Sequence, residues 1–213
     1  MGRTILLGTT NPVKQEHLAW LLEGLPLRIV RPVEEGLSVE VEERGASHRE
    51  NALLKAVAWS RASGLLAIAS DGGLAVPALG ERWDSLRTHR FAGPAADERA
   101  RLEALLALMA PLTGGERRAF WREAVALAER GRPLKTWEAQ GGEGVIAPSF
   151  DPGRIYRGFW VATAWYFPQV GKTYAEMAPQ ERRRSGEPWS RLRPRVLRFF
   201  RERLLPGEGD DDP

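Results

Sequence analysis

A short segment near the N-terminus combines residue types that bind phosphate. Residues 8–14 read Gly-Thr-Thr-Asn-Pro-Val-Lys, between an apolar run that predicts a strand and a segment with leucines at helical spacing. Asn11 is a favoured helix N-cap, whereas Lys14 has the wrong charge for a helix N-terminus. An anion there would resolve the conflict, because backbone N–H groups, the Thr9 and Thr10 hydroxyls and the lysine would converge on it. The alternative is an ordinary capped helix with a solvated lysine.

A carboxylate follows a second apolar run. Residues 65–69, Leu-Leu-Ala-Ile-Ala, predict a buried strand that ends at residues 70–74, Ser-Asp-Gly-Gly-Leu. The carboxyl end of such a strand, followed by glycines that let a ligand approach the backbone, is the usual position for active-site chemistry in α/β proteins. The alternative is that Asp71 only begins a turn, since Asp-Gly is a common turn dipeptide.

An acidic loop and a lysine-bearing helix precede that strand. Three glutamates lie within residues 40–43, and Ser47 with Glu50 forms a capping box for a helix that ends at Gly64. Lys55 is therefore held on a rigid helical face. The chain has lysine at only four positions, which are 14, 55, 135 and 172. A position that keeps the compact ammonium group in an arginine-rich chain is informative.

The remaining segments predict an alternation of strands and helices. Further elements are expected at 27–30 (strand), 97–109 (helix) and 190–205 (helix). Residues 117–129 fit either a helix or a long strand. Residues 133–146 carry the pattern of a β-hairpin with its turn at Gly141-Gly142.

Composition limits the class of protein. The 213 residues are enough for one sizeable core or for two lobes that share a sheet, and the absence of cysteine excludes disulfides and thiol chemistry. No apolar run approaches a membrane span and no signal peptide is present, so we expect a cytoplasmic protein without a membrane partner. The net charge is only +3, since an acidic segment at 206–213, expected to be disordered, offsets a basic body. His17, His48 and His89 are too scattered to suggest a metal cluster and are interpreted as structural or surface residues.

Six motifs, taken together and in order, resemble the inosine/xanthosine triphosphate pyrophosphatase family. They are TTNPVK at 9–14, EERG at 42–45, ENALLKA at 50–56, SDGGL at 70–74, RFAG at 90–93 and GKTYAEM at 171–177. Enzymes of this family hydrolyse non-canonical purine nucleoside triphosphates to the monophosphate and pyrophosphate. The match extends from about residue 4 to residue 180 and is dense before residue 95.

The resemblance implies an α/β fold with an elongated, curved mixed sheet and flanking helices. It implies a single domain over residues 1–205, with two lobes around a deep nucleotide cleft, and a homodimer. It also assigns residues 117–129 to a long strand, against their locally helical pattern.

The resemblance further implies roles for particular residues. The implied phosphate-binding residues are Thr9, Thr10, Asn11, Lys14, Lys55 and Gly72. Glu42 and Asp71 correspond to carboxylates that bind Mg²⁺, and Asp71 is also the catalytic residue that orients or deprotonates the attacking water. The chemistry is consistent with these roles, because attack of water on a polyphosphate needs charge neutralisation more than covalent catalysis.

The chain departs from the family at two places. Ser70 stands where the family has the first of two acidic residues. In the base pocket, Ala162 replaces an aspartate, and Arg182 stands for a lysine that the family follows with Ser-His-Arg. The base-pocket candidates are Phe159, Trp160, Ala162 and Arg182. Loss of base-reading groups should relax or redirect base specificity, because such groups discriminate strongly when buried.

Two alternative functions remain open. The first is a non-catalytic nucleotide sensor or scaffold, favoured by Ser70 and by the missing base readers. The second is a nucleic-acid binder that uses the arginines of residues 182–195. Basic residues on a terminal helix are more often a solvated face, and the acidic tail opposes nucleic acid, so this partner is not expected.

Overall fold

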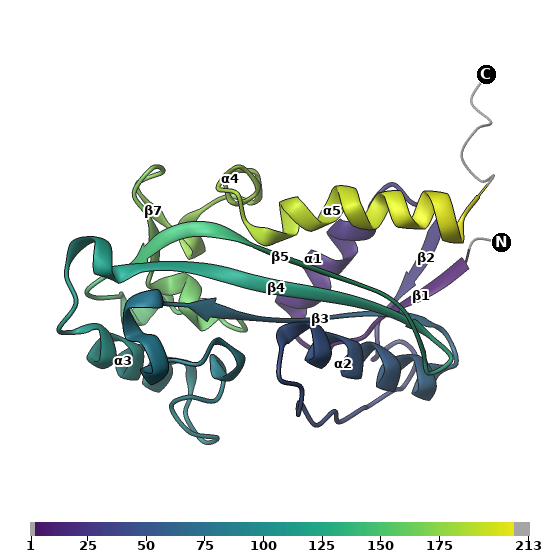
Figure 1. The fold of residues 1–213 in the computed structure, drawn as a ribbon, viewed down its shortest axis with the longest axis horizontal. Helices are drawn as coiled ribbons and strands as arrows, with labels where there is room; N and C mark the ends of the chain where they lie inside the picture. Colours follow the sequence, from purple (N-terminus) through teal and green to yellow (C-terminus); the bar gives the residue numbers. More distant parts are fainter. Residues whose placement is uncertain (1–2, 207–213) are drawn as a thin grey trace. The chain divides into compact units, whose positions relative to one another are not determined.

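The computed structural model describes residues 3–206, and its strands form one mixed sheet (Figure 1). The strands are β1 Arg3–Leu7, β2 Leu27–Val30, β3 Leu66–Ala75, β4 Arg118–Glu129, β5 Arg132–Ile146, β6 Trp165–Phe167 and β7 Lys172–Thr173. The helices are α1 Pro12–Leu22, α2 His48–Ser63, α3 Glu98–Met109, α4 Pro179–Arg184 and α5 Pro188–Phe199, and a π-helical turn, Phe200–Leu204, continues α5. The strand order is β2-β1-β3-β4-β5-β6-β7. Parallel pairing of β1 with β2 and β3, and antiparallel pairing of β6 with β5 and β7, confirm the predicted α/β class.

The chain divides into two compact units. Unit 1 contains the chain up to Asp71, the segment Glu123–Ala139 and the chain from Trp189 onward, whereas unit 2 contains Gly72–Arg122 and Gln140–Pro188. Three long strands, β3, β4 and β5, each contribute residues to both units. The predicted arrangement of two lobes around a nucleotide cleft stays a prediction.

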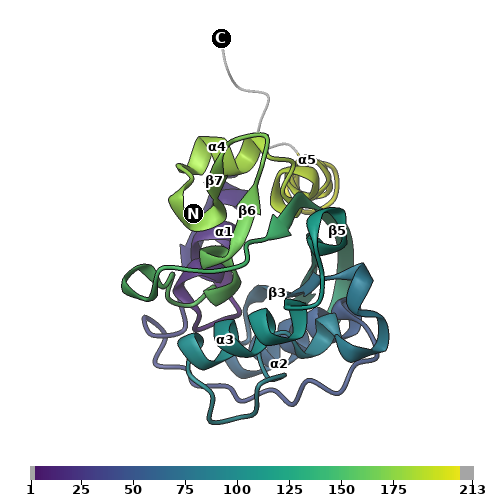
Figure 2. The same cartoon turned by 90° about the vertical axis from the view of Figure 1, so that its left-hand side faces the viewer.

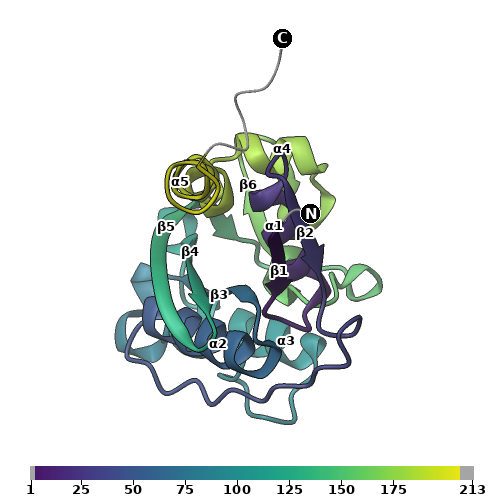
Figure 3. The same cartoon turned by 90° about the vertical axis from the view of Figure 1, so that its right-hand side faces the viewer.

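Side chains of β4 point alternately to the two faces of the sheet, so unit 1 has a core on each face. Val125 and Leu127 face the buried leucines of α1 and the apolar stripe of α5. Residues Ala124, Ala126 and Ala128 face the other way and contact the alanines of α2. Accordingly, α1 and α5 lie on one side of these strands and α2 on the other (Figures 1 and 3). Small side chains on both partners let α2 approach the sheet closely, so the residues that α2 carries lie next to β3.

Unit 2 has an aromatic core. Trp165, Phe167 and Tyr174 are almost completely buried and pack on one another, and the leucines of α3 join the same cluster. Figure 2 shows α3, β6, β7 and α4 of this unit. Gly73, at the start of the unit, cannot be replaced without movement, because a Cβ there would lie 1.9 Å from the carbonyl oxygen of Ser85.

The predicted N-caps and the glycine end of α2 are confirmed, whereas in the predicted capping box the Glu50 carboxylate accepts from the Ala46 N–H (2.7 Å). The Asn11 side chain caps α1 by accepting hydrogen bonds from the N–H groups of Val13 (2.9 Å) and Lys14 (3.2 Å). The Ser47 hydroxyl caps α2 through the Glu50 N–H at 3.2 Å. Gly64 ends α2 in the left-handed region at φ 69°.

Two predicted strand boundaries are wrong. The hairpin turn is not at Gly141-Gly142, since β5 is continuous there and the turn lies at Arg130 (φ 49°) and Gly131 (φ 76°). Gly142 instead permits close packing, because a Cβ would lie 2.8 Å from the Trp165 ring. The strand predicted over residues 65–69 covers Leu66–Ala75, so Asp71 lies within β3 and does not begin a turn. Within residues 117–129, Arg118–Glu129 form strand β4, as the resemblance predicted.

Between residues 3 and 206, none of the helices is both long and apolar enough to cross a lipid bilayer. The predicted disordered acidic tail, 206–213, lies outside the described residues except for Pro206.

Candidate active site

The carboxylate of Asp71 is bound at both oxygens by side chains of one helix. Lys55 Nζ lies 2.6 Å from Oδ1, and His48 Nδ1 lies 2.6 Å from Oδ2. His48 is the first residue of α2 and Lys55 lies two turns further on, so both project from the same helical face. Asp71 is 6% exposed and His48 4% exposed. A rigid helix therefore fixes a buried carboxylate from two directions.

The charges around Asp71 keep it ionised. Burial alone would raise the pKa of Asp71, but the His48 hydrogen bond and the positive charges of Lys14 and Lys55 outweigh burial and hold the Asp71 pKa far below its ordinary value. Burial alone would lower the pKa of Lys55, but the Asp71 and Glu43 carboxylates outweigh it and raise the Lys55 pKa. The pair is thus an aspartate anion and an ammonium cation at neutral pH.

The acidic loop places Glu43, and not Glu42, against Lys55. Glu43 Oε1 lies 2.6 Å from Lys55 Nζ. The Glu42 carboxylate pairs with Arg44, and its side chain is 68% exposed. The loop is tied to α2, because the Gly45 N–H donates to Asn51 Oδ1 at 2.8 Å. Of the two predicted metal carboxylates, only Asp71 makes a described contact with the lysine and histidine of α2.

The segment predicted to bind phosphate joins β1 to α1 in the same unit. The Asn11 carboxamide oxygen is used by the helix cap, and the Gln15 side chain donates to the Thr9 carbonyl at 2.8 Å. Thr10 is exposed, and Lys14 is partly buried and acts electrostatically on Asp71. The structure therefore places the Lys14 end of this segment within electrostatic reach of the Asp71 carboxylate.

The base-pocket candidates lie in unit 2, within its aromatic core. Trp160 and Ala162 are buried, and Phe159 packs on Trp121 and Tyr174. Arg182 lies over the rings of two tyrosines and donates to the Tyr174 carbonyl at 3.1 Å. Gly72 begins this unit as part of β3. Contact of any of these residues with a base or a phosphate stays a prediction.

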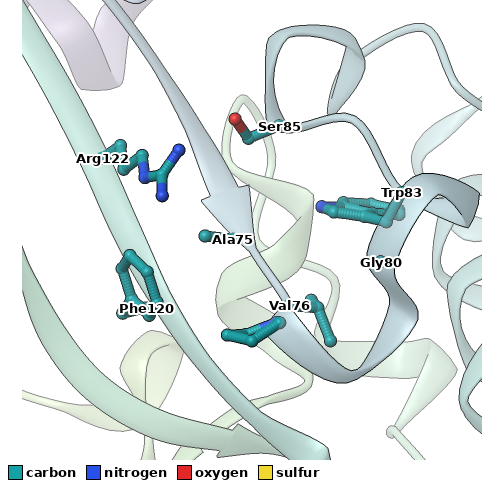
Figure 4. Close-up of a pocket in the computed structure, with 8 residues that line it drawn as sticks. Ala75, Val76, Gly80, Trp83, Ser85, Phe120 and Arg122 are labelled. Carbon is teal, nitrogen blue, oxygen red and sulfur yellow. The ribbon is translucent and has the colours of Figure 1, made fainter.

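Unit 2 also contains a hollow of about 200 Å³ (Figure 4). Its lining comes from the end of β3, the following turns and β4, and consists of Ala75, Val76, Pro77, Gly80, Trp83, Ser85, Phe120 and Arg122. None of the predicted site residues lines it.

Comparison with known proteins assigns the chain to a family. The sequence profile of the Ham1 family matches residues 5–187. The chain belongs to the Ham1 family. The chain also matches dITP/XTP pyrophosphatases, so its resemblance to the inosine/xanthosine triphosphate pyrophosphatase family is confirmed.

Relatives of this Ham1-family chain share most of its length. It is 38% identical over 180 residues to a dITP/XTP pyrophosphatase of Erwinia tasmaniensis, covering 84% of this chain and 85% of the relative. A dITP/XTP pyrophosphatase of Thermus thermophilus is 37% identical over 183 residues, covering 86% and 85%. Among solved structures, a HAM1 protein from Coxiella burnetii has a TM-score of 0.75 at 26% identity, covering 93% of this chain and 100% of that one.

Two residues that contact Asp71 or Lys55 in this Ham1-family chain are not predicted from the sequence. From the sequence, His48 is interpreted as a structural or surface residue, and the metal role is assigned to Glu42 and not to Glu43. The spacing held one signal, since His48 and Lys55 are seven residues apart on a capped helix and so share a face. No pattern in the sequence indicated that Asp71 lies opposite that face.

Asp71 is a carboxylate of the kind that Mg²⁺ binds. In the part of the chain that the structure describes, no group of three or more histidine, aspartate or glutamate side chains is placed to hold a metal ion. Mg²⁺ commonly binds through one or two carboxylates together with substrate phosphates, and the ionised Asp71 supplies one such carboxylate. Asp71 therefore fits the role of a protein carboxylate for Mg²⁺, and binding of the ion there stays a prediction.

Proposed function

We propose that this Ham1-family protein hydrolyses nucleoside triphosphates of the non-canonical purine type to the monophosphate and pyrophosphate, with Mg²⁺ as cofactor. One observation carries the proposal: the ionised Asp71 is clamped by Lys55 and His48 close to the charge of Lys14. Relatives that share more than four fifths of the chain are dITP/XTP pyrophosphatases, which supports the same reaction.

Each proposed site residue has its own role in binding or catalysis. Lys14 and Lys55 bind the phosphates, with Thr9, Thr10, Asn11 and Gly72 completing the phosphate site. Glu42 and Asp71 hold Mg²⁺, which supplies neutralisation of negative charge on the phosphate oxygens. Asp71 orients the attacking water. The pKa of Asp71 is far below its ordinary value, so this carboxylate acts as a ligand and hydrogen-bond acceptor. It does not readily take up the proton of the attacking water.

Binding of a triphosphate changes the partners of Lys55. Its ammonium group contacts two carboxylates, Asp71 and Glu43, at 2.6 Å each. A phosphate oxygen can displace Glu43 without disturbing the Asp71 contact, because the two carboxylates come from different segments. Lys55 would then link the substrate to the catalytic carboxylate.

Three further properties follow from the family resemblance and belong to the same proposal. The base preference is relaxed or altered, because Ala162 and Arg182 replace the groups that read the base in the family. The protein acts as a homodimer. It works in the cytoplasm.

The test is pyrophosphate release with Mg²⁺ across a panel of canonical and deaminated ribo- and deoxyribonucleoside triphosphates. We expect release from dITP or XTP at least, and the ranking reports the base preference. Asp71→Asn should reduce release at least about 100-fold, since the electrostatic contribution at the reacting centre is large. Undiminished release in Asp71→Asn would remove the catalytic assignment.

One observation favours a second function, a nucleotide sensor without turnover. Ser70, which stands where the family has an acidic residue, is 1% exposed, and its hydroxyl oxygen has no hydrogen-bond partner among the described residues. The site thus lacks one carboxylate that the family has at this position. If a folded protein binds Mg²⁺-nucleotide in calorimetry but releases no pyrophosphate from the whole panel, the sensor function replaces the enzyme.

A further inference from the structure

His48 is a buried polar residue that the proposed chemistry does not use. Its ring is 4% exposed, and Nδ1 lies 2.6 Å from Asp71 Oδ2 across 23 positions of the sequence. The ring therefore points to the carboxylate on which the proposed reaction depends.

The chemistry of the pair fixes which atom donates. An ionised carboxylate has no proton to donate, so in this contact Nδ1 of His48 is the donor and Oδ2 of Asp71 is the acceptor. Orientation of a ligand carboxylate by a second hydrogen-bonding side chain is a recurrent feature of metal-assisted sites.

The helix makes the contact rigid. Ser47 caps α2 one residue before His48, and Lys55 two turns later binds the other Asp71 oxygen. Both contacts come from α2, so together they prevent rotation of the Asp71 carboxylate about its Cβ–Cγ bond. Lys55 alone would leave Oδ2 free to turn.

We propose that His48 is a positioning residue for this reaction: by holding Asp71 Oδ2 it fixes the orientation in which the carboxylate would bind Mg²⁺ and the attacking water. This inference rests on the function proposed above. It assigns to His48 no contact with substrate and no transfer of a proton. Loss of the His48 contact should lower kcat and leave KM almost unchanged, because the phosphate-binding residues of the β1–α1 segment are not held by His48.

The test compares three substitutions that differ in where a donor is placed. In His48→Asn the amide nitrogen occupies the place of Nδ1, in His48→Gln it reaches the place of Nε2, and in His48→Phe the ring remains without a donor. We expect kcat to fall about 10- to 100-fold in the Phe and Gln variants, with KM for the triphosphate changed less than about threefold, and His48→Asn to recover most of the loss. The matched control is His89→Asn, at an exposed position of unit 2, which should behave as wild type.

A measurement without substrate or metal keeps the inference independent of activity. In nitrogen-15 spectra of the histidine rings, His48 should show a protonated Nδ1 whose signal is lost in His48→Asn and shifts in Asp71→Asn. A ring protonated only at Nε2, or equal kcat in His48→Asn and His48→Phe, overturns the inference. Absence of turnover in the wild type would instead remove the proposed function, and the ring spectrum would still decide whether His48 holds Asp71.

Discussion

At the scale of single residues, the site depends on how Asp71 balances burial against its partners. A carboxylate that is 6% exposed loses most of its hydration, and only close donors offset that cost. Lys55 and His48 each satisfy one oxygen. Each oxygen keeps acceptor capacity, because a carboxylate has about four lone-pair positions. Asp71 is therefore stable in its buried place and still able to bind a metal or a water molecule.

The two neighbouring glutamates give a first prediction. Glu42→Gln should raise the Mg²⁺ concentration needed for half-maximal activity by about tenfold, since it removes a proposed ligand. Glu43→Gln should leave the Mg²⁺ dependence unchanged and lower KM for the triphosphate, because Glu43 competes with phosphate for Lys55. Steady-state kinetics with Mg²⁺ and nucleotide varied separately measures both. A shift of the Mg²⁺ dependence in Glu43→Gln alone would make Glu43 the metal ligand.

Ala162 gives a second prediction at this scale. It stands where the family has an aspartate, but its side chain is 0% exposed within the core of unit 2. Ala162→Asp should therefore cost about 3 to 5 kcal/mol of unfolding free energy, because an uncompensated charge would be buried. Urea unfolding followed by tryptophan fluorescence measures the loss. Ala95→Asp, at an exposed position, is the control, and equal stability of the two variants would contradict the reasoning.

At the scale of elements, α2 could be predicted almost completely and its role only in part. Ser47 and Gly64 are local signals, and the helix begins and ends where they indicate. Lys55 was found through a motif. His48 was not, because its partner Asp71 is distant in sequence and its identity as a partner depends on tertiary packing. The sheet shows the same limit. Gly142 resembles a turn residue in the sequence, but in the structure it allows close packing against the Trp165 ring.

The α2 cap gives a third prediction. Ser47→Ala removes the hydroxyl that accepts from the Glu50 N–H, so it should lower the unfolding free energy by about 1 kcal/mol. Ser47→Asn keeps a capping oxygen and should stay within a few tenths of a kcal/mol of wild type. Chemical unfolding monitored by circular dichroism compares the three proteins. Equal losses in both variants would show that the hydroxyl stabilises something other than the cap.

At the scale of the whole molecule, each unit has its own core and its own set of motifs. Lys14, Lys55 and Asp71, which are predicted to act at the phosphates, lie in unit 1, whereas the phosphate-binding candidate Gly72 begins unit 2. The base-pocket candidates lie in unit 2, where the motifs become sparse and where Arg182 makes contacts within the core. The structure confirms that Lys55 and Asp71, both singled out in the sequence, are in contact, and their roles in the reaction stay predictions. Sequence reasoning is weakest in unit 2, because aromatic residues of the kinds that could contact a base also pack its core.

The buried carboxyl of Glu187 makes the stability of the whole chain depend on pH in a defined direction. Glu187 is 3% exposed and accepts a hydrogen bond from the Tyr174 hydroxyl at 2.6 Å. Burial raises the pKa of Glu187 above its ordinary value and outweighs that hydrogen bond and the charges of Arg182 and Arg183. Between the unfolded and the folded pKa, the folded state holds more protons than the unfolded state, so the contribution of Glu187 to stability falls as pH rises.

Glu187→Gln tests this argument, because glutamine stays neutral and its carbonyl oxygen can still accept from Tyr174. At a pH below the ordinary glutamate pKa, both proteins carry a neutral group and should unfold at nearly the same temperature. As pH rises through the raised pKa, wild type should become the less stable of the two, and the difference should then level off. Calorimetric unfolding from pH 4 to pH 8 measures the difference, with Glu81→Gln at an exposed position as the control. A constant difference across that range would mean that burial does not govern the ionisation of Glu187.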